Sequence, residues 1–160
     1  MAIYMKYGDI KGSVATDGFK DWIMLDSFNW SVSRNAALPI RQEDTREGAE
    51  PNITEVVVSK RMEKASPKLW QEAVGGAFNT KATIRFTTTA QGKMESFLEY
   101  ELTDTGLSSY SINSENPDGV PHENLTLNFA KVIWKYGAFD AKTNSSPAAV
   151  GWDLTKQAKQ

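Results

Sequence analysis

The sequence predicts a mainly β protein: an antiparallel β-barrel of two packed sheets with one short flanking α-helix and a long extended loop. Most of the chain alternates between apolar and polar residues, which is the period of a β-strand. Helical spacing occurs in one short segment, about residues 67–74, and strands do not alternate with helices along the chain. This order favours antiparallel pairing over a parallel sheet with crossover helices. The length of 160 residues favours a single domain over residues 1–160.

The first two strands are expected at residues 2–7 and 22–32. One face of the second strand is apolar and is expected in the core, at Trp22, Met24, Phe28, Trp30 and Val32. The opposite face becomes polar in its second half, at Ser27, Asn29 and Ser31. The second half of this strand is therefore expected to have one buried face and one face in water.

A long loop is expected at about residues 34–52, because this segment has no periodicity and contains Pro39, Gly48 and Pro51. Loops of this length inside a compact domain are unusual, and they are often functional or held by a partner. The loop also carries charges of both signs, at Arg34, Arg41, Glu43, Asp44, Arg46 and Glu47.

The chain changes from strand to helix after residues 53–61. Ser66 is a favourable N-cap residue and Pro67 suits the first helical position, so we expect the helix to run from Pro67 to about Val74. Gly75 and Gly76 follow and are expected to end it.

The remaining strands are expected in the second half of the chain. Residues 82–87 and 94–102 alternate on both sides of a turn at Gly92 and predict a hairpin, and a separate strand is expected at 107–112. The alternation in residues 123–136 changes phase near Ala130, which indicates either a β-bulge or a strand that bends between two sheets. A last strand is expected around residues 150–154.

Composition excludes several classes of function. The net charge of −2 and the absence of a basic stripe argue against nucleic-acid binding. The chain has no cysteine, so disulfides and thiolate metal sites are excluded. No segment is apolar enough for membrane insertion, and the N-terminus does not resemble a signal peptide. We therefore expect synthesis in the cytoplasm without a leader.

The candidate catalytic residues of the sequence are few and isolated, so we expect a protein that is not an enzyme. The one histidine, His122, lacks neighbours at the spacing of a catalytic triad, and with Glu123 it makes a poor metal site. Glu99 and Glu101 share a strand face at a spacing compatible with a glycosidase pair, but a solvated face explains them as well. No cofactor is expected. The five tryptophans could stack on sugars but are expected in the core: Trp22, Trp30, Trp70, Trp134 and Trp152.

Five segments in order resemble one family. Residues Lys60–Leu69 resemble the strand-to-helix signature of the haemolysin-coregulated proteins (Hcp) of bacterial type VI secretion systems. The other four resemble, in turn, the opening segment, the long second strand, a late strand and the closing strand of that family: residues 7–12, 22–31, 123–132 and 151–154. The resemblance therefore extends over nearly the whole chain.

This resemblance implies a structural role. Members of the family form homohexameric rings that stack into a hollow tube, which leaves the cell through the secretion system with its spike and effectors. The implied partners are other copies of the chain, the spike, sheath and baseplate components, and small effector proteins in the lumen. The family's lumen-facing position corresponds to Asn29, so Ser27, Asn29 and Ser31 are the candidate lumen residues.

The loop differs from the family pattern, because many relatives have a loop rich in glycine and serine. The charged residues named above for this loop are the candidate ring or stacking contacts and suggest a salt-sensitive interface. Two other interpretations stay open at this stage, a phage-type tail tube protein and a carbohydrate-binding β-sandwich module.

Overall fold

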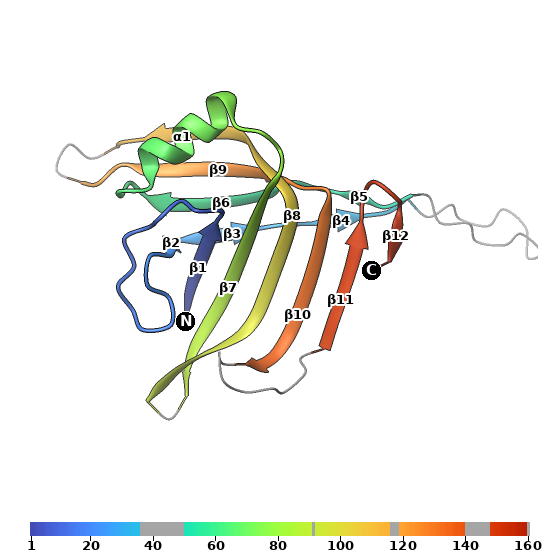
Figure 1. Ribbon diagram of the computed structural model, residues 1–160, viewed down its shortest axis with the longest axis horizontal. Helices are drawn as coiled ribbons and strands as arrows, with labels where there is room; N and C mark the ends of the chain where they lie inside the picture. Colours follow the sequence, from blue (N-terminus) through green and yellow to red (C-terminus); the bar gives the residue numbers. More distant parts are fainter. Residues whose placement is uncertain (36–49, 91, 116–118, 140–147, 160) are drawn as a thin grey trace, which may run out of the picture.

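The computed structural model describes residues 1–35, 50–90, 92–115, 119–139 and 148–159. Two antiparallel sheets pack around a common core, with helix α1 (Ser66–Gly75) beside them (Figure 1). The larger sheet has the order β12-β11-β10-β8-β7-β1-β2 and the smaller sheet the order β3-β6-β9-β8. This arrangement confirms the predicted class, a mainly β protein of two packed antiparallel sheets with one short helix.

The strands of the larger sheet are β1 (Ala2–Tyr7), β2 (Ile23–Leu25), β7 (Thr80–Ala90), β8 (Lys93–Asn113), β10 (Lys131–Phe139), β11 (Ala148–Asp153) and β12 (Ala158–Lys159). The smaller sheet adds β3 (Ser27–Asn29), β6 (Val56–Arg61) and β9 (His122–Asn128) to the C-terminal half of β8. A separate two-stranded pair consists of β4 (Val32–Ser33) and β5 (Asn52–Ile53).

Strand β8 belongs to both sheets. The sequence predicted two strands in this region, but the structure has one strand that pairs first with β7 and β10 and then with β9. The backbone turns at Asp104, which has a φ of 50°, and Gly106 follows two residues later. A Cβ on Gly106 would lie 2.3 Å from the ring of Phe78, so glycine leaves room for this ring where the strand changes sheets.

The phase change near Ala130 is a second crossing between the sheets. Strand β9 ends at Asn128 in the smaller sheet, and β10 begins at Lys131 in the larger one. The N–H of Ala130 donates to the carbonyl of Thr103 at 3.0 Å, which ties this crossing to the bend in β8. The second of the two interpretations offered by the sequence, a strand that bends between two sheets, is therefore confirmed.

The predicted strand at residues 22–32 is divided into β2, β3 and β4, and its first half faces the opposite way from the prediction. Ile23 and Leu25 are buried, whereas Met24 is 54% exposed. At Phe28 and Trp30 the predicted phase holds, since both pack against the core, but it is wrong for Val32, which is 61% exposed. Because Leu25 and Phe28 both face inward three residues apart, the alternation restarts where the chain passes from the larger sheet to the smaller.

The core lies between the two sheets and receives from the helix Leu69, which is completely buried, and the partly buried Ala73. The other fully buried apolar side chains come from both sheets: Met5, Ile23, Val56, Val58, Ala82, Ile84, Leu102, Leu125 and Leu127. In the part of the chain that the structure describes, no helix is both long and apolar enough to cross a membrane.

Candidate functional site: the polar face of the smaller sheet

The outward face of the smaller sheet carries small uncharged side chains in two rows across its strands. One row contains Ser27, Ser59, Asn124 and Ser111, and the next contains Asn29, Val57, Thr126 and Ser109. Seven of these eight residues are serine, threonine or asparagine, and none is charged. We call these two rows the polar face.

The polar face follows directly from strand alternation. The intervening residues of the same strands point inward, among them Val56, Val58, Leu125 and Leu127, all of which are buried. Neighbouring side chains interact along a row: the hydroxyl oxygens of Ser27 and Ser59 are 2.5 Å apart. The face therefore offers hydroxyl and amide groups to water, without a charge that would bind one ligand strongly.

The structure places two of the three predicted lumen residues on the polar face. Ser27 and Asn29 lie on β3 and are exposed. Ser31 is also exposed but lies beyond β3, where its hydroxyl oxygen is 3.1 Å from that of Thr54. Arg34 is exposed, and the other predicted interface residues lie outside the described residues: Arg41, Glu43, Asp44, Arg46 and Glu47.

Six residues of the polar face were not predicted from sequence, because they lie on the other three strands. A signal for them exists in β9, where Asn124 and Thr126 alternate with the buried Leu125 and Leu127. The same alternation of small polar and apolar residues could have been sought in every strand. This alternation does not predict the cross-strand register, which places Asn124 opposite Ser59 and Ser111.

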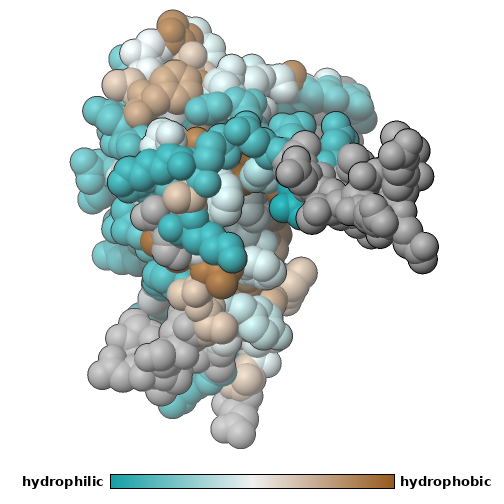
Figure 2. All heavy atoms as spheres, turned by 90° about the vertical axis from the view of Figure 1, so that its right-hand side faces the viewer, coloured by the Kyte–Doolittle hydropathy of each residue, from teal (hydrophilic) through white to brown (hydrophobic). Residues whose placement is uncertain are grey.

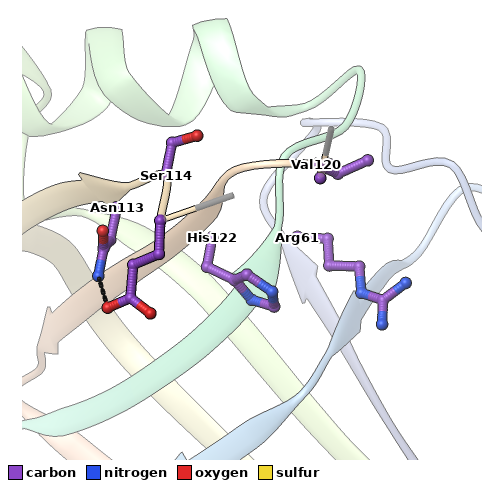
Figure 3. A pocket seen from close by; sticks show the side chains of 7 residues that line it. Arg61, Asn113, Ser114, Val120 and His122 are labelled. Atoms are coloured by element: carbon purple, nitrogen blue, oxygen red, sulfur yellow. Dashed lines mark hydrogen bonds between the residues drawn. The ribbon is translucent and has the colours of Figure 1, made fainter. Parts of the chain in front are cut away.

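A third row closes one end of the polar face with one charged, one ionisable and one amide side chain. Arg61, His122 and Asn113 pair across β6, β9 and β8, and Figure 3 shows His122 between the other two. They line a pocket with Glu115, whose carboxylate accepts a 3.1 Å hydrogen bond from the amide of Asn113. His122 Nδ1 lies 3.5 Å from a carboxylate oxygen of Asp26. Among the described residues no group of three or more histidine and acidic side chains could hold a metal ion.

Glu99 and Glu101 do not have the environment of a glycosidase pair. Lys135 bridges the two carboxylates at 3.0 and 3.3 Å, Arg85 lies 2.5 Å from Glu99, and Lys81 lies 2.8 Å from Glu101. Burial acts to raise the pKa of Glu101, but the hydrogen bonds from Lys81 and Lys135 outweigh it and lower that pKa. A general acid needs the opposite shift. The expected solvated face is also wrong for Glu99, which is buried beneath its cations.

The tryptophans have three kinds of environment. Trp30 and Trp152 pack against the core as predicted, and Trp22 lies beneath the guanidinium of Arg85. Trp70 and Trp134 are 54% and 42% exposed, so the prediction of a core position is wrong for these two. They lie on α1 and β10 respectively and do not form a common stacking platform of the kind that a carbohydrate module uses.

A buried polar network lies directly beneath the polar face. Lys60 on β6 and Glu123 on β9 form a completely buried ion pair, and the hydroxyl of Tyr110 on β8 also donates to Glu123. Ser66, at the start of α1, donates to Glu123 at 2.9 Å and accepts from Lys60 at 3.1 Å. Burial, together with the hydrogen bond to Glu123, raises the pKa of Tyr110. The network joins three strands of the smaller sheet to the helix.

This network corrects the role predicted for Ser66. The residue at the N-cap position is Ala65, and no side chain caps the helix there. The hydroxyl of Ser66 instead turns into the protein, where it also accepts a 2.9 Å hydrogen bond from the N–H of Glu63. The sequence contained a local capping pattern, but in the structure the hydroxyl donates to Glu123, 57 positions away.

Replacement of Ser66 by alanine is expected to lower the free energy of unfolding by about 1–3 kcal/mol, because it leaves buried polar groups of Lys60 and Glu123 with one partner fewer. Loss of an ordinary cap would cost about 1 kcal/mol. Chemical denaturation of the protein measures the difference. Ser109→Ala, on the exposed polar face, serves as the matched control and should change the stability by less than about 0.5 kcal/mol. Equal losses in the two variants would contradict this role.

Comparison with known proteins gives one consistent result. The family model described as "Type VI secretion system effector, Hcp" matches residues 4–136. A solved structure of a type six secretion system protein is 24% identical, with a TM-score of 0.85 over 99% of both chains. Hcp1 from Salmonella typhimurium is 20% identical, with a TM-score of 0.73 over 99% of both chains. A type VI secretion effector from Yersinia pestis is 16% identical, with a TM-score of 0.71 over 94% of this chain and 98% of that one. No curated protein matches the sequence.

Proposed function

The chain belongs to the Hcp family of type VI secretion proteins, and from this premise we propose that it forms hexameric rings that stack into the inner tube of such a system. The polar face would line the bore of this tube. The observation that carries the proposal is the pair of uncharged rows across four strands. A water-filled conduit needs a hydrated inner surface that does not bind its contents tightly, and uncharged hydroxyl and amide groups provide one.

The position of this sheet within the subunit also supports a ring. Strands β3 and β8 are the outer strands of the smaller sheet, so each has one side without a strand partner in that sheet among the described residues. A head-to-tail contact between the β3 side of one copy and the β8 side of the next would repeat the polar face around an axis. Such contacts form closed rings when the rotation between copies is a simple fraction of a turn.

We further propose the partners and route that the resemblance implies. The tube would travel through the type VI system with its spike, inside the sheath and above the baseplate. Small effector proteins would rest against Ser27, Asn29 and Ser31 in the lumen. The charged residues of the 34–52 segment, Arg34 among them, would add contacts between copies. The same architecture is compatible with a phage-type tail tube, which the absence of sheath and spike genes beside its gene would favour.

The experiment that tests the bore assignment is a comparison of cysteine reactivity at Asn29 and Lys6. The chain has no cysteine, so Asn29→Cys and Lys6→Cys each introduce a single thiol. Lys6 is exposed on β1, in the larger sheet, and serves as the control. A small maleimide should label both variants, whereas a bulky polymer-linked maleimide should label Asn29→Cys much more slowly than Lys6→Cys in assembled protein.

Dissociation of the assembly should remove this difference, because both positions are then open to solvent. Native mass spectrometry of the unmodified chain supplies the assembly state. A stable monomer at high protein concentration would overturn the ring. Equal labelling by the bulky reagent in an assembled ring would overturn the placement of Asn29 in the bore.

A further inference from the structure

The core-facing side of the larger sheet continues past the area that the smaller sheet covers. In Figure 1 the lower parts of β7, β8, β10 and β11 extend below β3. Trp134 and Tyr136 on β10 and Val150 on β11 lie on the same side of the sheet as the buried Val132. They are nevertheless 42%, 61% and 61% exposed. We call these three residues, which have the composition of a core but lie in water, the apolar ledge.

The apolar ledge is linked to strand β3 through one aromatic ring, that of Tyr100 on β8. The ring of Trp134 stacks on Tyr100 at 6.1 Å, and Tyr100 in turn stacks on Phe28 of β3 at 4.8 Å. The ledge is therefore the outer end of an aromatic stack that begins in the core. Figure 2 shows the side of the molecule that includes β11, where hydrophobic spheres gather in the lower half beneath a hydrophilic band.

A second exposed apolar surface lies at the other side of the smaller sheet. Helix α1 and the end of β8 form a groove with Met62, Trp70 and Ile112 at its rim, which are 37%, 54% and 52% exposed. Its floor contains Ser66 and Tyr110, both members of the buried polar network. The floor is therefore fixed by hydrogen bonds, so the groove is a preformed concave surface. We call it the α1–β8 groove.

We propose that the apolar ledge of one copy of this chain occupies the α1–β8 groove of the next copy. The positions of the two surfaces carry this inference. The ledge is linked to β3 through Tyr100, and the C-terminal half of β8 lines the groove. Strands β3 and β8 are the two outer strands of the smaller sheet. A contact that brings the β3 side of one copy to the β8 side of another therefore brings ledge and groove together.

The chemistry of the two surfaces agrees with their positions. Each groups large apolar or aromatic side chains at the surface, and such side chains are typical of the buried centre of an interface. Two different patches on one subunit that fit each other make a heterologous contact, the type that closes into rings. This inference rests on the proposed ring and adds the surfaces that hold it together.

The test is cross-linking between Gln71, which lines the groove, and Ala148, which is exposed and pairs with Tyr136 on the ledge. Because the chain has no native cysteine, a short bismaleimide joins only the introduced thiols. The double variant Gln71→Cys/Ala148→Cys should give a ladder of covalent multimers. Each single variant alone should remain monomeric on a denaturing gel, and a mixture of the two single variants should give dimers.

Substitution of the aromatic residues provides a second measurement. Trp134→Ser and Trp70→Ser should each raise the concentration needed for assembly by about thirtyfold, the effect expected for truncation of a buried interface tryptophan. Lys68→Ser, at an exposed position on the same helix, is the control and should leave assembly unchanged. Circular dichroism of each variant checks that the subunit is folded.

The outcomes separate this inference from the proposed function. Rings that form without a Gln71–Ala148 cross-link, or single variants that cross-link to themselves, would overturn the ledge-to-groove contact and leave the ring standing. Absence of any assembly of the unmodified chain in native mass spectrometry would overturn the proposed ring, and this contact with it.

Discussion

Replacement of Lys60 by methionine is expected to remove about 3–5 kcal/mol from the free energy of unfolding, the usual effect of leaving one charge of a buried pair without its partner. Both side chains of the Lys60–Glu123 pair are completely buried. The ammonium of Lys60 donates to Glu123, to Ser66 and to the carbonyl of Arg61, so all three of its protons are used. Without it, Glu123 keeps only the hydroxyls of Ser66 and Tyr110 as donors.

The measurement is chemical denaturation of the dissociated subunit, extended to a double-mutant cycle. Lys60→Met/Glu123→Leu removes both charges and should be more stable than Lys60→Met alone, since well-packed apolar residues often replace a buried pair without loss. If the change in the free energy of unfolding of the double variant equals the sum of the changes in the two single variants, the pair is not coupled and the network does not act as described.

The pair also has a consequence for the polar face. Lys60 and Glu123 lie directly opposite each other in a region where the other inward residues are mostly valine and leucine. A slip of β6 against β9 by two residues would keep the apolar side inward but would place Lys60 against Leu125. Such a slip is prevented by the charge that would be left unpaired. The pair therefore fixes the register that aligns the rows of the polar face.

Replacement of Leu69 by alanine is expected to destabilise the subunit by about 2–5 kcal/mol, the range measured for large-to-small changes in cores. Leu69 is the one apolar residue of α1 that is completely buried, whereas its neighbour Trp70 is 54% exposed. Leu69 is thus the main apolar anchor of the helix, beside the hydrogen bonds of Ser66 and the partly buried Ala73. Thermal or chemical unfolding of the dissociated subunit measures the effect.

Trp70→Ala is the matched comparison on the same helix. It should change the stability of the dissociated subunit by less than about 1 kcal/mol, because most of the side chain is already in water. Its effect should instead be on assembly, through the α1–β8 groove. A large loss of subunit stability in Trp70→Ala, or a small one in Leu69→Ala, would reverse the assignment of anchor and contact residue.

Alternation predicted the strands better than it predicted their inward faces. The first strand was predicted at residues 2–7, and the structure has β1 at Ala2–Tyr7. In the next strand, however, both Ile23 and Met24 are apolar, and the period of two does not say which of them is inside. Ile23 lies in the core because β2 pairs with β1 in the larger sheet. This pairing joins residues that are distant in the sequence.

The same limit applies to the candidate site. Ser27 and Asn29 could be named because a resemblance placed them, but the polar face depends on the register of four strands drawn from residues 27 to 126. The local motif at Ser66 was misread for the same reason, since its decisive partner is distant in the sequence. Alternation identifies residues that share a side, and only the tertiary structure decides what that side faces.

The passage of β8 through both sheets has a mechanical meaning. The strand continues over 21 residues, from the hairpin with β7 to the edge of the smaller sheet. Sliding one sheet over the other would require breaking its hydrogen bonds to β7 and β10 or those to β9, because the covalent backbone itself does not stretch. A thrust applied to one sheet is thus passed on to the other by a single unbroken polypeptide segment.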